Sequence, residues 1–125
     1  MSDNTQPLLN QWEQSYKKGL LSFWILLAIS QEALYAYEMR ERVETLSQNS
    51  ISADENSIYR ALRRFAKNGL VSSEMRPSDI GPNRRYFQLT PKGETLLSDF
   101  INRNLAVFSS KNVKQAMTKI INNSK

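Results

Sequence analysis

The stretch that decides the fold is residues 53–93, ADENSIYRALRRFAKNGLVSSEMRPSDIGPNRRYFQLTPKG. Its first part predicts an amphipathic helix, because its apolar residues share one arc at about 100° per residue. These residues are Ile58, Ala61, Leu62 and Phe65. The opposite arc is polar and cationic, and it holds Asn56, Arg60, Arg63 and Lys67, with Tyr59 and Arg64 at its edges. Asp54 is a good N-cap for this helix, and Gly69 predicts its end in a left-handed conformation.

A β-hairpin is expected directly after this helix. Residues 70–75 and 85–89 have strand-like patterns, and in the second of them side chains alternate with a period of two. The loop expected between them, residues 77–83, is kept out of regular structure by Pro77, Gly81 and Pro82. Thr90 followed by Pro91 then predicts the start of the last helix.

Two further helices are expected before the cationic one. After a disordered lead at residues 1–7, a helix is expected from about Leu8 to Ile29, with a second half that is apolar nearly all round. A second helix is expected from about Tyr35 to Leu46, followed by a polar turn at residues 47–50. The fold class is therefore mainly α with a small β-hairpin (α+β), arranged as a winged helix-turn-helix.

Charge and composition limit the classes of function that this chain can have. Residues 1–50 carry four Lys/Arg against six Asp/Glu, residues 51–90 seven against four, and residues 91–125 six against two. The basic second half favours a polyanionic partner. The chain has no Cys and no His, and no nucleophile–base pair is visible, so we expect no enzyme, no metal site and no cofactor. The longest apolar run is far shorter than a membrane span, and the acidic N-terminus does not look like a signal peptide, so a cytoplasmic location is expected.

The order and spacing of several motifs resemble the PadR family of bacterial winged-helix transcription regulators. The resemblance runs over about Leu20 to Phe108. It rests on Leu34-Tyr35-Ala36-Tyr37-Glu38-Met39, on Ser57-Ile58-Tyr59-Arg60-Ala61-Leu62-Arg63-Arg64-Phe65, on Asn68-Gly69-Leu70-Val71, on Gly81-Pro82-Asn83-Arg84-Arg85-Tyr86-Phe87 and on Leu89-Thr90-Pro91-Lys92-Gly93. This chain differs from the family pattern in having Ala36 for a glycine and Arg60 for a proline. The short C-terminal part is similar to the smaller branch of the family.

That resemblance implies a division into three parts. Residues 1–7 are the lead, residues 8–92 the winged helix-turn-helix DNA-binding domain with its N-terminal helix, and residues 93–125 a C-terminal dimerisation helix. The conformation after Ser109 is left open, as a continued helix, a segment folded back, or a frayed end.

The residues expected at duplex DNA combine the helix and the hairpin. They are Asn56, Ser57, Tyr59, Arg60, Arg63, Lys67, Arg84 and Arg85. Arg and Asn can read base edges, while Lys and Ser more often contact phosphate. Arg84 and Arg85 must point to opposite faces of a strand, so we expect one of them to reach DNA. The plainer interpretation is a solvated basic face and a charged hairpin edge, with Tyr59 packed against the hairpin.

An apolar stripe on the last helix and the apolar first helix predict a homodimer on a palindromic operator. The interface residues expected are Trp24, Leu97, Phe100, Ile101, Leu105 and Phe108. The alternative is that the stripe packs back on its own domain. The resemblance also implies a small aromatic or hydrophobic effector at the dimer interface, for which Trp12 and Trp24 are the candidates. However, residues 102–105 hold no Trp on which a planar compound could stack, and most tryptophans on apolar helices serve packing.

Two classes of function remain. The first is a sequence-specific DNA-binding regulator, expected to act as a homodimeric repressor. The second is a winged-helix adaptor that binds protein without DNA. They differ in salt dependence, which is steep for a DNA binder.

Overall fold

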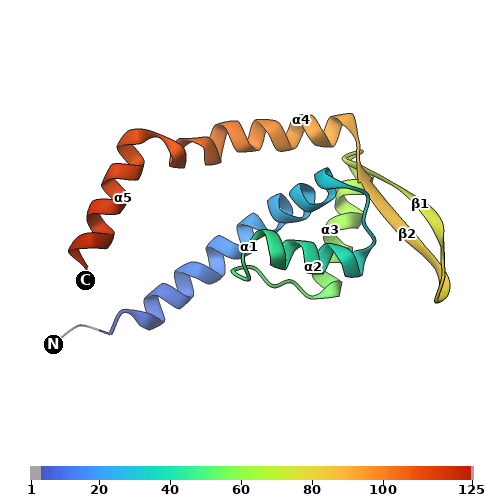
Figure 1. Cartoon of the computed structure of the whole chain (residues 1–125), viewed down its shortest axis with the longest axis horizontal. Helices are drawn as coiled ribbons and strands as arrows, with labels where there is room; N and C mark the ends of the chain where they lie inside the picture. The colour runs from blue at the N-terminus through green and yellow to red at the C-terminus, as the bar shows by residue number, and fades with distance from the viewer. Residues whose placement is uncertain (1–3, 125) are drawn as a thin grey trace.

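The computed structural model describes residues 4–124, and it is mainly helical with one antiparallel hairpin, as the sequence predicts. The elements in chain order are α1 (Gln6–Gln31), α2 (Ala36–Leu46), α3 (Glu55–Lys67), β1 (Val71–Ser78), β2 (Gly81–Leu89), α4 (Pro91–Phe100), a π-helical turn (Ile101–Leu105), a 3-10 turn (Ala106–Ser109) and α5 (Lys111–Asn123). Figure 1 shows α1, α2 and α3 packed together, with the hairpin projecting at one end and α4 crossing above.

The core lies between the second half of α1 and the inner faces of α2 and α3. Its largest fully buried side chains include Ile25, Met39, Val43, Ile58 and Leu62. The first half of α1 extends away from this core, and its residues are largely exposed (Figure 1). α1 begins at Gln6, so Gln6 and Pro7 belong to the helix and not to a lead; residues 1–3 of the expected disordered lead lie outside the described residues.

Local chemistry fixes the ends of α3. The Asp54 carboxylate accepts a hydrogen bond from the Ser57 N–H at 2.7 Å, which confirms Asp54 as the N-cap. Gly69 follows the helix with φ +75°, as expected for a residue in the left-handed region. The turn before α3 uses two non-glycine residues in that same region, Gln48 and Asn49. These features place α3 across α2 in the helix-turn-helix arrangement.

The hairpin is longer than the sequence suggests. β1 and β2 pair from Val71↔Leu89 to Arg76↔Arg84, and the pairing resumes at Ser78↔Gly81 after a bulge. Pro77 and Pro82, expected in a loop, therefore lie inside strands. A two-stranded ribbon tolerates this because each strand has a free edge that needs no backbone donor, and a bulge removes further pairing.

A third backbone segment joins the hairpin. Leu34 forms a β-bridge with Phe87: the Leu34 N–H donates to the Phe87 carbonyl at 3.1 Å, and the Phe87 N–H donates to the Leu34 carbonyl at 2.9 Å. The hairpin is thus hydrogen-bonded to the segment that leads into α2, which fixes its position relative to the helices.

α4 starts where the sequence predicts and packs very closely on the backbone of Leu70, between α3 and β1. Thr90 Oγ1 accepts from the Gly93 N–H at 3.1 Å and donates to the Gly69 carbonyl at 2.6 Å. A Cβ on Gly93 would lie 2.2 Å from the Leu70 carbonyl oxygen, so only glycine fits without movement.

Residues 93–125 do not form one continuous helix, and of the conformations left open after Ser109 the structure shows a second helix that turns back. α4 passes through the π-helical and 3-10 turns, the chain becomes extended at Ser110, and α5 begins with Ser110 Oγ accepting from the Val113 N–H at 3.4 Å. Serine is a favoured N-cap, so the Ser109-Ser110 pair starts a new helix in a new direction. In Figure 1, α5 turns back toward the N-terminal end of α1.

Within residues 4–124, no helix has the length and apolar character needed to cross a membrane.

Candidate nucleic-acid interface

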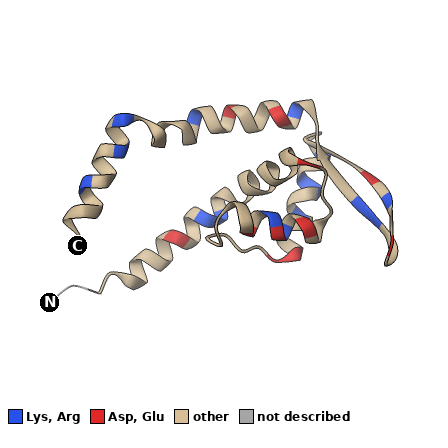
Figure 2. Cartoon of the chain, in the orientation of Figure 1, with Lys and Arg blue, Asp and Glu red and all other residues tan. Residues whose placement is uncertain are grey.

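The outer face of α3 carries the predicted recognition residues together. Asn56, Tyr59, Arg60, Arg63 and Lys67 are all exposed, and the buried side chains of this helix lie on the opposite arc. Figure 2 shows blue bands on α3, and both blue and red bands on the hairpin and on α2. The structure therefore presents the face that the sequence predicts.

Ser57 differs from its neighbours because it is half-buried. Its N–H is used by Asp54, and its Oγ accepts a hydrogen bond from Arg60 Nη2 at 3.2 Å. Hydrogen bonds from Ser57, first of all from its backbone N–H, hold the pKa of the Asp54 carboxyl below its ordinary value of 3.8. The N-terminal turn of α3 is thus internally bonded, and Ser57 orients Arg60 more than it offers a free hydroxyl.

The cations of α3 are not neutralised by neighbouring acids. Among residues 4–124, no carboxylate lies within 4.0 Å of a charged nitrogen of Arg60, Arg63 or Lys67, whereas Arg42 pairs with Glu32 at 3.1 Å. A polyanion that docks on α3 would not have to displace an internal ion pair. This is the electrostatic condition for binding phosphate-rich partners.

The two hairpin arginines point to opposite faces, as predicted. Arg84 is half-buried, donates from Nη1 to the Tyr35 hydroxyl at 2.6 Å, and lies with its Cζ 4.5 Å from the centre of the Tyr35 ring. Arg85 is exposed and donates from Nη1 to Ser73 Oγ at 3.0 Å. Arg84 is held by α2's first residues, while Arg85 extends along the hairpin.

Aromatic contacts strengthen the attachment of the hairpin. Tyr86 meets Tyr35 edge-to-face at 5.4 Å, and the Arg76 guanidinium lies 4.5 Å from the centre of the Tyr86 ring. Arg76 also pairs with Glu74 at 2.8 Å. Arg84, Tyr35, Tyr86 and Arg76 thus form one chain of contacts across the hairpin and the start of α2, with an arginine at each end.

A hollow of about 480 Å³ lies where α2, α3 and the hairpin meet. Its polar lining comes from Tyr35, Tyr37, Tyr59, Asn83, Arg84 and Arg85, with Glu55 as its carboxylate. Tyr59 is thus both exposed on α3 and beside the hairpin, where it faces Met75 across the hollow.

Tyr35 and Tyr37 also line this site, although from the sequence they were expected only as part of a family motif. The sequence does contain a signal for these two tyrosines. Leu34 and Ala36 already fill the core at the start of α2, so the tyrosine side chains beside them are not both needed for the core.

The six residues expected at a dimer interface differ in how exposed their side chains are. Leu97 is only 6% exposed and belongs to the core of its own chain, so its side chain offers almost no surface to a partner. Phe100 is half-buried and stacks on Phe23 at 5.9 Å, and Trp24, Ile101 and Leu105 are also half-buried. Only Phe108 among the six is mostly exposed, at 52%. The stripe on α4 packs on α1 of the same chain.

Other apolar side chains are exposed at both ends of the chain. They are Leu8, Leu9, Trp12 and Tyr16 on α1, Val107 and Phe108 in the 3-10 turn, and Met117, Ile120 and Ile121 on α5. Trp12 is 74% exposed, whereas the Trp24 indole nitrogen is buried and has no hydrogen-bond partner among the described residues. About 18 Å of helix separates these two tryptophans, since they are twelve residues apart at 1.5 Å each.

Nothing in the described part of the chain has the arrangement of a metal centre, since residues 4–124 contain no group of three or more Cys, His, Asp or Glu placed to hold an ion.

Comparisons with known proteins agree with this geometry. The family described as "Transcriptional regulator PadR-like family" matches residues 25–99. A PadR-like transcriptional regulator from Bacillus cereus is 31% identical, with a TM-score of 0.57 over 85% of this chain and 91% of the other. A Streptococcus transcriptional regulator is 30% identical, with a TM-score of 0.59 over 82% and 93%. PadR of Bacillus subtilis, solved in complex with operator DNA, shares the fold at 20% identity, with a TM-score of 0.60 over 66% and 46%. The α1–α4 winged helix with its cationic α3 and attached hairpin, and the match over most of that region, show that the chain belongs to the PadR-like family of transcriptional regulators.

Proposed function

We propose that this regulator binds duplex DNA through α3 and the β1–β2 hairpin. The observation that carries the proposal is the outer face of α3, where exposed cations that no carboxylate of residues 4–124 neutralises lie beside an arginine-bearing hairpin. A relative with the same fold was solved on operator DNA. An enzyme is not supported, since the family consists of transcriptional regulators.

Each recognition residue has a role that follows from its position. Arg60 and Arg63 would reach base edges in the major groove, where arginine bonds guanine through two hydrogen bonds, and Asn56 would read adenine. Lys67, at the C-terminal end of α3, would contact a phosphate. Arg85, on the hairpin, would contact the phosphate backbone or the minor groove of the DNA.

The exposed apolar side chains support a homodimer. Trp12 on α1, Phe108 in the 3-10 turn, and Ile120 on α5 are each more than half exposed. Apolar surface of this extent at both ends of a small chain is typical of an interface. The interface proposed here therefore lies farther toward the chain ends than the α4 stripe suggested. Two-fold symmetry would place two α3 helices on a palindromic operator.

Repression is the regulatory outcome we propose, because a dimer seated on promoter DNA blocks access of the polymerase. Such a protein acts in the cytoplasm, where that DNA is. The division into a DNA-binding unit over residues 8–92 and a dimerisation segment over residues 93–125 stays a prediction. The same holds for an aromatic or hydrophobic effector near Trp12 and Trp24.

Fluorescence anisotropy on the DNA upstream of the protein's own gene, against scrambled DNA, tests the DNA-binding proposal. Arg63→Ala should weaken binding to the upstream DNA by about 1–3 kcal/mol, or roughly 5- to 150-fold. Arg42→Ala is the matched control: it removes the same charge from α2, where the arginine pairs with Glu32. Equal, salt-insensitive binding to both DNAs would refute direct recognition and favour the protein-adaptor function.

Light scattering tests the dimer. At micromolar concentration we expect the mass of two chains, and Ile120→Asp should shift it to one. Ile80→Asp, at the hairpin tip where Ile80 is 87% exposed, should leave the dimer intact. A stable wild-type monomer would end this proposal.

A further inference from the structure

The hollow between α2, α3 and the hairpin is rich in hydrogen-bond donors. Arg84 and Arg85 line it from the hairpin, Tyr35 and Tyr37 from the start of α2, and Tyr59 from α3. The Tyr37 hydroxyl is engaged by Glu41, so the donors left for a partner come from the other four residues. Against two arginines the lining has one carboxylate, Glu55. An anion with several acceptor oxygens matches such a set better than a neutral apolar compound does.

Arg84 is fixed in this hollow before any partner arrives. One of its five N–H groups donates to the Tyr35 hydroxyl, and its guanidinium lies on the Tyr35 ring. Tyr35 is itself held by the edge of Tyr86, and its ring stacks with that of Tyr37 at 6.5 Å. The remaining guanidinium donors of Arg84 therefore have a set direction, which lowers the entropic cost of binding an anion.

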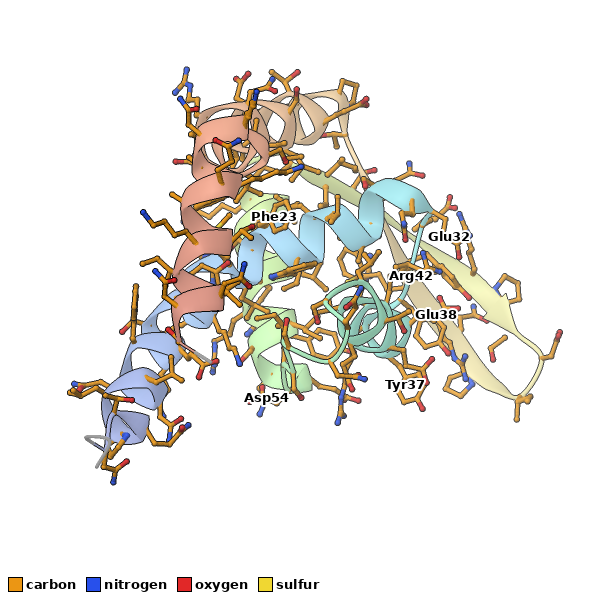
Figure 3. The ribbon with its side chains drawn as sticks, turned by 60° about the vertical axis from the view of Figure 1, so that its left-hand side comes forward. Phe23, Glu32, Tyr37, Glu38, Arg42 and Asp54 are labelled. Atoms are coloured by element: carbon orange, nitrogen blue, oxygen red, sulfur yellow. The ribbon has the colours of Figure 1, made fainter. Side chains whose placement is uncertain are left out.

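Tyr37 forms the outer wall of the hollow. Figure 3 shows it at the beginning of α2, on the side that faces the hairpin and away from α1. A hydrogen bond with Glu41 and the negative charge of Glu41 raise the pKa of the Tyr37 hydroxyl above its ordinary value of 10.0. The ring therefore stays neutral at physiological pH and adds no phenolate charge beside the arginines.

We propose that this hollow seats one backbone phosphate of the bound DNA on Arg84, and that Tyr35 is the positioning residue that aims Arg84 at it. This inference rests on the proposed function and deepens it. The two hairpin arginines then have different roles. Arg84, held by Tyr35, anchors the hairpin to that phosphate. Arg85, which is exposed and donates to Ser73 Oγ, contacts a neighbouring part of the DNA. Both arginines contact DNA, which differs from the expectation that one would.

The test uses the full-length protein and upstream DNA duplexes in which one phosphate at a time is replaced by an uncharged methylphosphonate. For the wild type, one position in each half-site should lower affinity. Arg84→Ala should bind unmodified DNA more weakly, and it should lose no further affinity at that position. Its salt slope should fall by about 0.9 for each phosphate contact removed. Tyr35→Phe keeps the ring, and hence the contact with Tyr86, so it should fold and show a reduced response at the same position.

Arg76→Ala is the matched control. Arg76 lies on a tyrosine ring at the same 4.5 Å as Arg84 does, yet it pairs with Glu74 and does not line the hollow. It should respond to every methylphosphonate as the wild type does. If Arg84→Ala and Tyr35→Phe weaken binding evenly, and no phosphate position couples to them, Arg84 has only a structural role and the inference is wrong. That result is distinct from failure of DNA recognition itself, in which the upstream DNA would not be preferred and Arg63→Ala would have no effect.

Discussion

Gly93→Ala should destabilise the fold although it replaces a glycine within a helix. The added Cβ would lie 2.2 Å from the Leu70 carbonyl oxygen and 2.8 Å from Leu89 Cδ1. Carbon–oxygen contacts are ordinarily at least about 3.3 Å, so α4 and the Leu70 backbone before β1 must separate by about 1 Å. The Leu70 carbonyl also accepts from the Thr90 N–H at 3.0 Å, and that hydrogen bond would be strained or lost.

The magnitude follows from three contributions. Overpacking of a close contact costs about 1–3 kcal/mol. Loss of the hydrogen bond costs about 1 kcal/mol, and the higher helix propensity of alanine returns up to about 1 kcal/mol. We expect a net loss of about 1–4 kcal/mol in the free energy of unfolding, at roughly 4 °C in Tm for each kcal/mol in a chain of this size.

Gly19→Ala is the control for this prediction. Gly19 also lies within a helix, but an added Cβ there would meet no atom within 4 Å. This variant should gain up to about 1 kcal/mol from helix propensity alone. Both variants would be unfolded by urea at one protein concentration. If Gly93→Ala proves as stable as Gly19→Ala, the close approach of α4 to Leu70 is not a constraint and the reasoning fails.

Two further predictions concern helix N-caps. Thr90→Ala removes the acceptor for the Gly93 N–H and the donor to the Gly69 carbonyl, so it should cost about 1–2 kcal/mol in urea unfolding, and Thr90→Ser should recover most of this. Asp54→Asn tests the lowered pKa of the Asp54 carboxyl, which contributes stability above its ordinary value of 3.8 and loses it as the pH falls through and below that value. Since asparagine is an equally good N-cap, the urea midpoint of Asp54→Asn should fall less between pH 7 and pH 3 than that of the wild type, and parallel falls would show that Asp54 carries no such pH dependence.

The sequence predicts α3 well because several independent signals agree there. The apolar arc, the Asp54 cap and Gly69 all specify the same helix, and its exposed face follows from the same periodicity. The position of Thr90 and Pro91 likewise specifies the start of α4. These features depend on residues close together in the sequence, so the sequence alone can predict them.

The errors arise where distant residues decide the outcome. Pro77 and Pro82 read as loop residues, but a two-stranded ribbon has free edges on which proline is harmless. The burial of Leu97 in its own chain likewise depends on distant residues, which the periodicity of the stripe does not show. The contact of Tyr35 with Arg84 spans 49 positions in sequence, and no periodicity could reveal it.

The exposure of α5 has a consequence for how the protein folds. This helix has 13 residues, and apart from the half-buried Val113 its described side chains are exposed. Isolated helices shorter than about 12–15 residues are marginal in water, so α5 gains little stability from its own chain. If a second copy covers it, helix formation and association become one equilibrium governed by mass action. The helical signal in far-ultraviolet circular dichroism would then decrease on dilution, in step with the loss of dimer.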